Sequence, residues 1–184
     1  KDKAVVIGYP SEYSEEQLGV LCGIFDALNI NVIGLVNSDL SSLTESNIQE
    51  PIHLVRLQMN HVALIIVESN ETLSIKSVKC KENHGLIQLY DEIVKMLQRV
   101  FIMQCRVDPL INGDAEHYLR TQIPNWLTVA NTKKVFYINT LINGNLYKTE
   151  MTSDYIYTVV NNFFKIFLKH EDLNNFKLVF CPTA

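Results

Sequence analysis

The sequence predicts an α/β protein. Short β-branched runs alternate along the chain with segments in which apolar residues recur at helical spacing. The first strand, helix and strand follow one another with tight joints, which favours a right-handed crossover and a parallel strand pair. Hydrophobic residues make up 47% of the chain and charged residues 20%, enough apolar material for a sizeable core.

The N-terminal segment contains the crossover. Residues 3–10 (KAVVIGYP) are β-branched and apolar, as in a strand buried on both faces. Ser14 and Gln17 have the spacing of a capping box, so a helix should begin there and run to about Leu28, with Asn29 as a left-handed stop. The helix should bury one face, composed of Leu18, Leu21, Cys22, Phe25 and Leu28.

A second strand and three further strands are expected in the next part of the chain. NVIGLV forms the second strand, and Ser38 or Asp39 should cap a helix after it. The segment 43–51 is polar and is expected to be a connector. Residues 53–59 and 61–67 are short apolar runs, and residues 72–80 alternate as a half-buried strand does.

Helices dominate the following part. Gly85 precedes an amphipathic helix that should end near Cys105, with an exposed ion pair between Asp91 and Lys95. A shorter helix should start near Gly113 and stop near Pro124. The inward residues expected for the long helix are Leu86, Leu89, Ile93, Met96, Leu97, Val100 and Phe101.

The C-terminal part is expected to form a hairpin, a helix and a strand. Asn143-Gly144 is the strongest two-residue turn signal in the chain. Thr152, Ser153 or Asp154 should cap a helix that runs to about His170, and FKLVFCPTA should be a last buried strand.

Charge and cysteine content exclude several classes of function. The formal net charge is -4 and lysines are interspersed with acids, so no basic stripe is available for nucleic acid. No apolar run approaches the ~18 residues of a membrane span, and no signal peptide opens the chain. The cysteines show no metal-ligand spacing, so buried free thiols and a reducing cytoplasm are expected; they are Cys22, Cys80, Cys105 and Cys181.

The element order resembles the nucleotide-binding domain of DnaK-type heat-shock chaperones, in the actin-like ATPase superfamily. The segment AVVIGYPSEYSEEQLGVLCGIFDALNINVIGLVNSDLSSL is similar to the family's strand, "PAYF", helix and "LNVLRIINEPTAAAL". The segment VFYINTLINGNLYKTEMTSDYIYTVVNNFF resembles the outer hairpin followed by "ITRARFEEL", and KLVFCPTA resembles "IVLVGGSTR".

The resemblance implies an actin-like, ribonuclease H-like fold present in part. Residues 1–50 would be the end of the first lobe, and residues 51–184 most of the second lobe. An outer helix-hairpin subdomain would span about 106–170. The chain begins at Lys1 directly before a strand and ends just after another, so a fragment of a longer protein is expected.

The resemblance also implies where a nucleotide would lie. The family hairpin "DLGGGTFD" closes on the phosphates through glycine backbone groups. Matched on Thr72, it places Val67 at the aspartate and Ser69, Asn70 and Glu71 at the three glycines. The phosphate-loop positions are Glu68, Ser69, Asn70, Glu71 and Thr72.

Two further nucleotide positions depart from the family pattern. Asn37 is in register with the family asparagine, but Ser38 stands where the family has an acidic residue. The double glycine of "VGGSTR" is Cys181-Pro182. We therefore expect the fold to be kept and ordinary ATP chemistry to be lost.

The expected function is that of a DnaK-related scaffold or interaction module with a protein or peptide partner, no catalytic residue and no metal site. The alternative is an active Mg-ATP hydrolase whose phosphate contacts precede Lys1. A sugar-kinase relative would need a catalytic aspartate and a glycine-rich turn, which the sequence does not show.

Other residue groups favour simpler interpretations. Glu68 and Glu71 could act as an acid/base or metal pair, but solvated turn acids are commoner. His53 and His61 have no third ligand in sight, so core or edge positions are favoured. His84-Gly85 could bind an anion at a helix start, and a plain helix entry is favoured instead.

Overall fold

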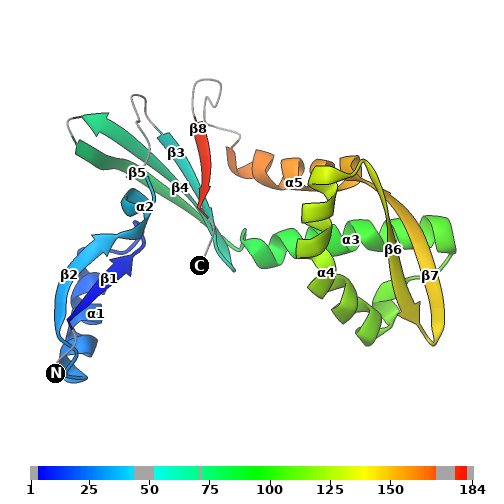
Figure 1. Cartoon of the computed structure of the whole chain (residues 1–184), viewed down its shortest axis with the longest axis horizontal. Helices are drawn as coiled ribbons and strands as arrows, with labels where there is room; N and C mark the ends of the chain where they lie inside the picture. The colour runs from blue at the N-terminus through cyan, green and yellow to red at the C-terminus, as the bar shows by residue number, and fades with distance from the viewer. Residues whose placement is uncertain (1–3, 44–51, 71, 169–176, 182–184) are drawn as a thin grey trace. The chain divides into compact units, whose positions relative to one another are not determined.

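A computed structural model describes residues 4–43, 52–70, 72–168 and 177–181. The chain forms two compact units. Unit 1 comprises Lys1–Asn83 and Asp172–Ala184, and unit 2 comprises His84–Glu171. The α/β class is confirmed, because both helices and sheets are present (Figure 1). The predicted lobes divide the chain elsewhere than these units do, and they stay a prediction.

Unit 1 begins with the predicted crossover. Strands β1 (Val5–Tyr9) and β2 (Val32–Asn37) are parallel, with helix α1 (Glu15–Ala27) between them. Ser14 caps α1 through the predicted capping box, and Asn29 has the predicted positive φ of 54°. Local chemistry therefore sets both ends of this helix.

Helix α1 is less buried than its apolar pattern predicts. Four of the five residues expected to face inward are only partly buried, and Leu28 is 63% exposed. Val20 and Ile24 are exposed on the same helix. None of the described residues covers this second apolar face.

A four-stranded sheet forms the rest of unit 1. Strands β3 (Ile52–Leu57), β4 (His61–Asn70) and β5 (Thr72–Glu82) form an antiparallel meander, and β8 (Lys177–Cys181) pairs parallel with β3. The strand order is β5-β4-β3-β8. The core beneath it consists of Leu43, Ile52, Leu54, Ala63, Ile65 and Val67, against which Leu40, Leu73, Ile75 and Val78 pack.

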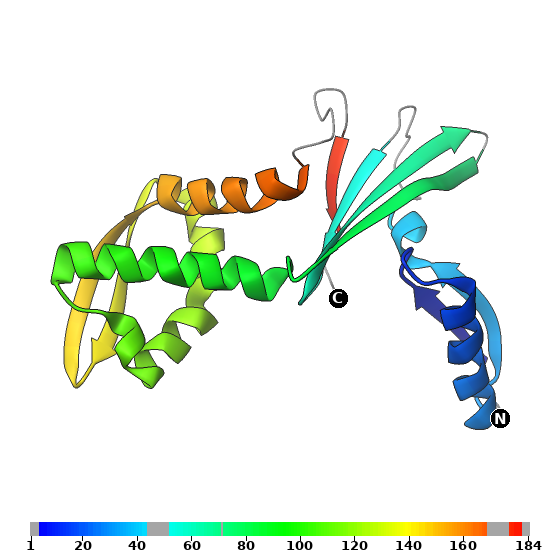
Figure 2. The same ribbon diagram turned by 180° about the vertical axis from the view of Figure 1, so that it is seen from behind.

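The described part of unit 2 contains three α-helices and a hairpin. Helix α3 (Leu86–Cys105) lies beside helix α5 (Ser153–Leu168) in both views (Figures 1 and 2). A 3-10 turn, η1 (Pro109–Ile111), leads into helix α4 (Gly113–Thr132), and β6 (Val135–Ile142) pairs antiparallel with β7 (Asn145–Thr152). The predicted inward face of α3 is confirmed except that Leu86 is half-buried.

The hairpin turn is confirmed where the sequence predicts it. Ile142 pairs with Asn145, so Asn143 and Gly144 are the two turn residues. Both have positive φ, 50° and 79°, as a type I′ turn requires. The turn therefore also sets the register of the two strands.

Two predictions about the helices of unit 2 are wrong. Helix α4 does not stop near Pro124, which lies inside it. Leu119, Ile123, Trp126 and Ala130 form one buried stripe across the proline, and this burial outweighs the lost backbone hydrogen bond. The exposed pair Asp91–Lys95 does not form, because Asp91 binds Arg120 at 2.6 Å and Lys95 binds Glu92 at 2.7 Å.

The replacement Pro124→Ala is expected to stabilise unit 2. Alanine restores an N–H donor in the helix interior and removes the ring clash, changes worth up to ~3 kcal/mol in an exposed helix. Urea unfolding followed by fluorescence of Trp126, the single tryptophan, measures the change close by. Thr121→Ala on the same helix is the control and should shift stability by only about 0.5 kcal/mol. A destabilised Pro124→Ala variant would contradict the interpretation.

Candidate polar site at the strand ends of unit 1

Five polar residues meet in unit 1 where three strands end. Ser11 and Glu12 follow β1, Asp39 lies in the short helix α2 (Ser38–Ser41) after β2, Arg56 lies near the end of β3, and His61 begins β4. We call these five residues the Arg56 cluster. Asp39 is 0% exposed and Arg56 6%, so its centre is fully buried.

The centre of the cluster is the ion pair between Asp39 and Arg56. Nη1 of Arg56 donates to Oδ1 of Asp39 at 2.8 Å and to Oδ2 at 3.0 Å. Ser11 donates to the same Oδ2 from its backbone N–H at 2.8 Å and from its hydroxyl at 2.5 Å. Each carboxylate oxygen therefore accepts a hydrogen bond, as a buried charge requires.

Glu12 extends the cluster toward the β3–β4 turn. Its Oε2 accepts from Nη2 of Arg56. Its Oε1 accepts from Nε2 of Gln58 at 3.4 Å and lies 3.3 Å from Nε2 of His61. One guanidinium thus bridges two carboxylates, and Nε of Arg56 is left buried without a hydrogen-bond partner among the described residues.

The short helix α2 is held in place by its own cap. The predicted caps, Ser38 and Asp39, are wrong, because Asn37 is the cap residue. Its Oδ1 accepts from the N–H groups of Asp39 at 3.0 Å and Leu40 at 3.1 Å. Ser38 instead donates its hydroxyl to the carbonyl of Tyr9 at 3.0 Å. This hydrogen bond joins the start of α2 to the end of β1.

The predicted phosphate-loop residues have a different setting. Glu68, Ser69 and Asn70 belong to β4 and pair with Ser74, Leu73 and Thr72 of β5, so they do not form an open turn. Glu68 lies 2.5 Å from Nζ of Lys76, which compensates its charge. Thr72 is exposed at the start of β5. Glu71 and Pro182 lie outside the described residues, as do the side chains of Ser69, Asn70 and Cys181.

The strand register separates the predicted nucleotide positions into two groups. Arg56 pairs with Ala63 of β4 and with Cys181 of β8, so Cys181 belongs to the Arg56 end of the sheet together with Asn37 and Ser38. Glu68 lies five residues further along β4 from Ala63, about 16 Å at ~3.3 Å per residue. Residues 68–70 and 72 therefore lie at the opposite end of the sheet.

The sequence analysis did not identify Arg56 or Glu12. A signal was present, because Arg56 interrupts the apolar run IHLVRL of a buried strand. A buried arginine needs a carboxylate partner, but nothing in the sequence indicates which acid comes near it.

Three of the four cysteines are free thiols that are less buried than predicted, and the side chain of Cys181 lies outside the described residues. Cys22 and Cys105 are partly buried and Cys80 is exposed. Cys80 pairs in the sheet with Ala63, beside the Arg56 cluster. Partial desolvation raises the pKa of the Cys80 thiol, and the negative charge of Glu12 raises it further, while Arg56 opposes them.

His53 and His84 have structural settings, as predicted. His53 is buried in the sheet at 2% exposure. The ring of His84 stacks on that of Phe163 with centroids 3.9 Å apart, and its Nε2 lies 2.8 Å from the carbonyl oxygen of Phe163. The Gly85 N–H at the start of α3 donates to Gln88, which leaves a plain helix entry there.

Comparison with models of known protein families and with curated proteins gives no match for this chain. Across the described residues, no helix is both long and apolar enough to cross a membrane. The same part of the chain contains no group of three His, Cys, Asp or Glu side chains placed to hold a metal ion.

The buried ion pair should be important for the stability of unit 1. Asp39→Asn leaves the Arg56 charge with one carboxylate in a buried setting, and breaking such a pair costs about 3–5 kcal/mol. Hydrogen exchange of β3 and β4 peptides should report this loss. Lys76→Met removes an exposed pair in the same unit and should cost under about 1 kcal/mol. Equal effects of the two variants would show that Asp39 is not the centre.

The raised pKa of Cys80 should slow its alkylation. The thiolate is the nucleophile, so a raised pKa means less thiolate at pH 8. Glu12→Gln removes a negative charge that raises this pKa and should accelerate the reaction of Cys80 with iodoacetamide, followed by peptide mass spectrometry. Glu16→Gln, an exposed acid of α1, should leave the rate unchanged.

Proposed function

We propose that this chain is a DnaK-related scaffold or protein-interaction module whose nucleotide site is degenerate. The observation that carries the proposal is the buried Arg56 cluster, which fills the strand ends of unit 1 with internal ion pairs. Further support comes from the order of the elements, the position and charge of the cluster, the residues of the β3–β4 turn and the exposed apolar surface of unit 1.

The observed element order supports the actin-like part of the proposal. The resemblance depends on strand, helix, strand and helix, followed by a strand hairpin, a long helix, a short helix, a hairpin, a helix and a last strand. The described elements follow this order, except that three strands stand in place of the strand hairpin and α4 is as long as α3. The last strand, β8, returns from unit 2 to pair with β3, the first strand of the meander.

The position of the cluster supports the nucleotide part. In open α/β sheets, ligands bind outside the carboxyl ends of parallel strands. In unit 1 the parallel pairs are β1–β2 and β3–β8. The Arg56 cluster lies at their carboxyl ends, together with Asn37, Ser38 and the backbone of Cys181.

A phosphate-binding hairpin at this end of the sheet would be the β3–β4 turn, not residues 68–72. The turn residues are Gln58, Met59 and Asn60, and none is a glycine. The Gln58 N–H donates to the carbonyl of His61 at 2.9 Å, so it already has a partner within the turn. The position expected for the phosphate hairpin is therefore one hairpin earlier than residues 68–72. Neither 58–60 nor 68–72 contains a glycine.

Electrostatics at the cluster disfavour a polyphosphate. Arg56 is already shared by Asp39 and Glu12. A phosphate charge about 4 Å from Glu12 would be repelled by ~4 kcal/mol at an effective dielectric of ~20. Drawing Arg56 toward a phosphate would leave Asp39 buried and uncompensated, at a further cost.

Exposed apolar surface in unit 1 supports the interaction part. The β1–β2 sheet has two strands among the described residues, and such a ribbon is marginally stable alone. Val6, Ile33 and Val36 are exposed on it, as are Val20 and Ile24 on α1. Apolar surface of this kind is typical of sites that a partner covers.

Calorimetric titration with Mg-ATP and Mg-ADP tests the proposal. No binding tighter than about 1 mM is expected, since a DnaK-type site would need phosphate contacts that the cluster excludes. Amide NMR shifts of residues 58–61 should stay unchanged on addition of nucleotide. Micromolar affinity with shifts at residues 58–61 would overturn the proposal and favour the active ATPase.

A further inference from the structure

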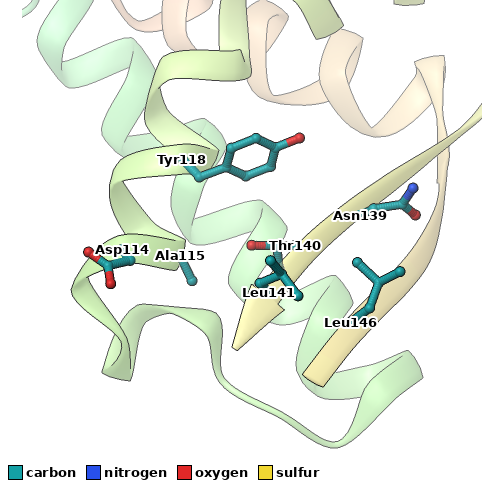
Figure 3. Close-up of a pocket in the computed structure, with 7 residues that line it drawn as sticks. All are labelled: Asp114, Ala115, Tyr118, Asn139, Thr140, Leu141 and Leu146. Atoms are coloured by element: carbon teal, nitrogen blue, oxygen red, sulfur yellow. The ribbon is translucent and has the colours of Figure 1, made fainter. Parts of the chain in front are cut away.

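Unit 2 contains a groove between helix α4 and strand β6. It is a cavity of about 360 Å³. Figure 3 shows Tyr118 and Ala115 projecting from α4 toward β6. We call it the α4–β6 groove; its lining residues are Asp114, Ala115, Tyr118, Asn139, Thr140, Leu141 and Leu146.

A buried hydroxyl in this groove lacks a partner. Thr140 is 3% exposed, and its Oγ1 forms no hydrogen bond with any described residue. In Figure 3 this oxygen points from β6 toward α4. Buried polar atoms almost always have a hydrogen-bond partner, so this oxygen indicates a polar group that an occupant would supply.

The backbone edge of β6 is open along the groove. Ile142 and Asn145 flank a two-residue turn and form a hydrogen-bonded pair, so the alternate residues, among them Asn139 and Leu141, point their N–H and C=O groups away from β7. No described residue hydrogen-bonds to these outward groups. Asn139 and Leu141 are two residues apart, which is the spacing of the backbone groups that hydrogen-bond to a strand added at a sheet edge.

On the outer edge of β7, outward backbone groups of Glu150 and Lys148 have hydrogen-bond partners. Gln104 of α3 accepts from the Glu150 N–H at 2.8 Å and donates to the Glu150 carbonyl at 2.9 Å. The Cys105 thiol lies 3.4 Å from the carbonyl oxygen of Lys148. Side chains of α3 therefore take the place of a neighbouring strand on β7, and α4 does nothing equivalent for β6.

The rim of the groove is apolar and carries one negative charge. Leu141 and Leu146 are 61% and 69% exposed, and they pair directly across the hairpin. Asp114 lies on the other rim, exposed and without an ion pair among the described residues. At the hairpin tip, Asn112 donates to Asn143 at 3.2 Å and joins the turn to α4.

We propose that the α4–β6 groove binds an extended peptide segment of a partner protein, which adds to β6 as a third strand. The segment carries an apolar side chain for the surface formed by Leu141, Leu146 and Tyr118, and a lysine or arginine for Asp114. Main-chain hydrogen bonds to Asn139 and Leu141 give affinity, and the side chains give selectivity. The inference does not depend on the loss of nucleotide binding, because the groove lies in unit 2.

A defined probe tests this binding mode. The probe is a fluorescein-labelled, acetylated peptide, Arg-Val-Thr-Leu-Thr-Val-Arg, titrated with the full chain by fluorescence anisotropy. Binding tighter than about 1 mM is expected. In the same peptide with both arginines replaced by aspartate, the affinity should fall at least about tenfold because of Asp114.

Methylated peptides distinguish strand addition from simple apolar contact. N-methylation of alternate amides blocks one edge of the peptide strand. Methylation of the amides that face β6 should abolish binding, and methylation of the other series should leave it. Equal affinity of the two series would overturn strand addition and indicate a side-chain ligand instead.

Variants of the chain locate the site. Asn139→Pro removes an outward N–H without removing a bond to β7 and should abolish peptide binding. Val135→Pro, also on the outward set but outside the groove, is its control. Asp114→Lys should weaken binding, whereas Asp154→Lys in the first turn of α5 should not.

Three results would reject the proposal. One is the absence of binding to the arginine peptide by a chain whose circular dichroism is native. Another is binding that Asn139→Pro and Val135→Pro reduce equally. The third is a chain dimer in sedimentation that Asn139→Pro converts to monomer, because the occupant of β6 would then be a second copy of this chain.

Discussion

The arrangement of unit 1 depends on one buried cation. Arg56 lies on β3 with two acids from segments that follow β1 and β2, so a single guanidinium connects the crossover with the meander. Removing either acid would leave charge uncompensated at low exposure, which makes the cluster hard to open. The same feature that holds the strand ends together therefore occupies the place where a ligand of an α/β sheet would bind.

The register of β4 places Glu68 and the β3–β4 turn at opposite ends of the sheet. Two hairpins follow one another, and each consists of apolar runs joined by a polar turn, so sequence alone does not distinguish them. The assignment of residues 68–72 to the phosphate hairpin depends on matching Thr72 to a family threonine. The structure places Asn37 and Cys181 beside the other hairpin, next to Arg56. Lys76 compensates the charge of Glu68, and the residues of the other hairpin, 58–60, include no glycine.

Features governed by neighbouring residues could be predicted, and features governed by distant contacts could not. Ser14 and the Asn143-Gly144 turn act within a few residues, and both are confirmed. The continuation of α4 through Pro124 depends on burial of Trp126 in the core of unit 2, which no local rule contains. The partner of Arg56 is likewise set by the fold, since Asp39 and Glu12 lie 17 and 44 residues away in the chain.

Strand edges give the strongest contrast within the molecule. An exposed edge invites pairing, and proteins usually protect it with charge or cover. The edge strand β5 carries Lys76, Lys79 and Lys81, and β7 is covered by Gln104. Along the groove, β6 has Asn139 and Leu141 instead, with neither charge nor cover. Since β5 and β7 are protected by two different means, binding of a partner explains the unprotected segment of β6 better than chance does.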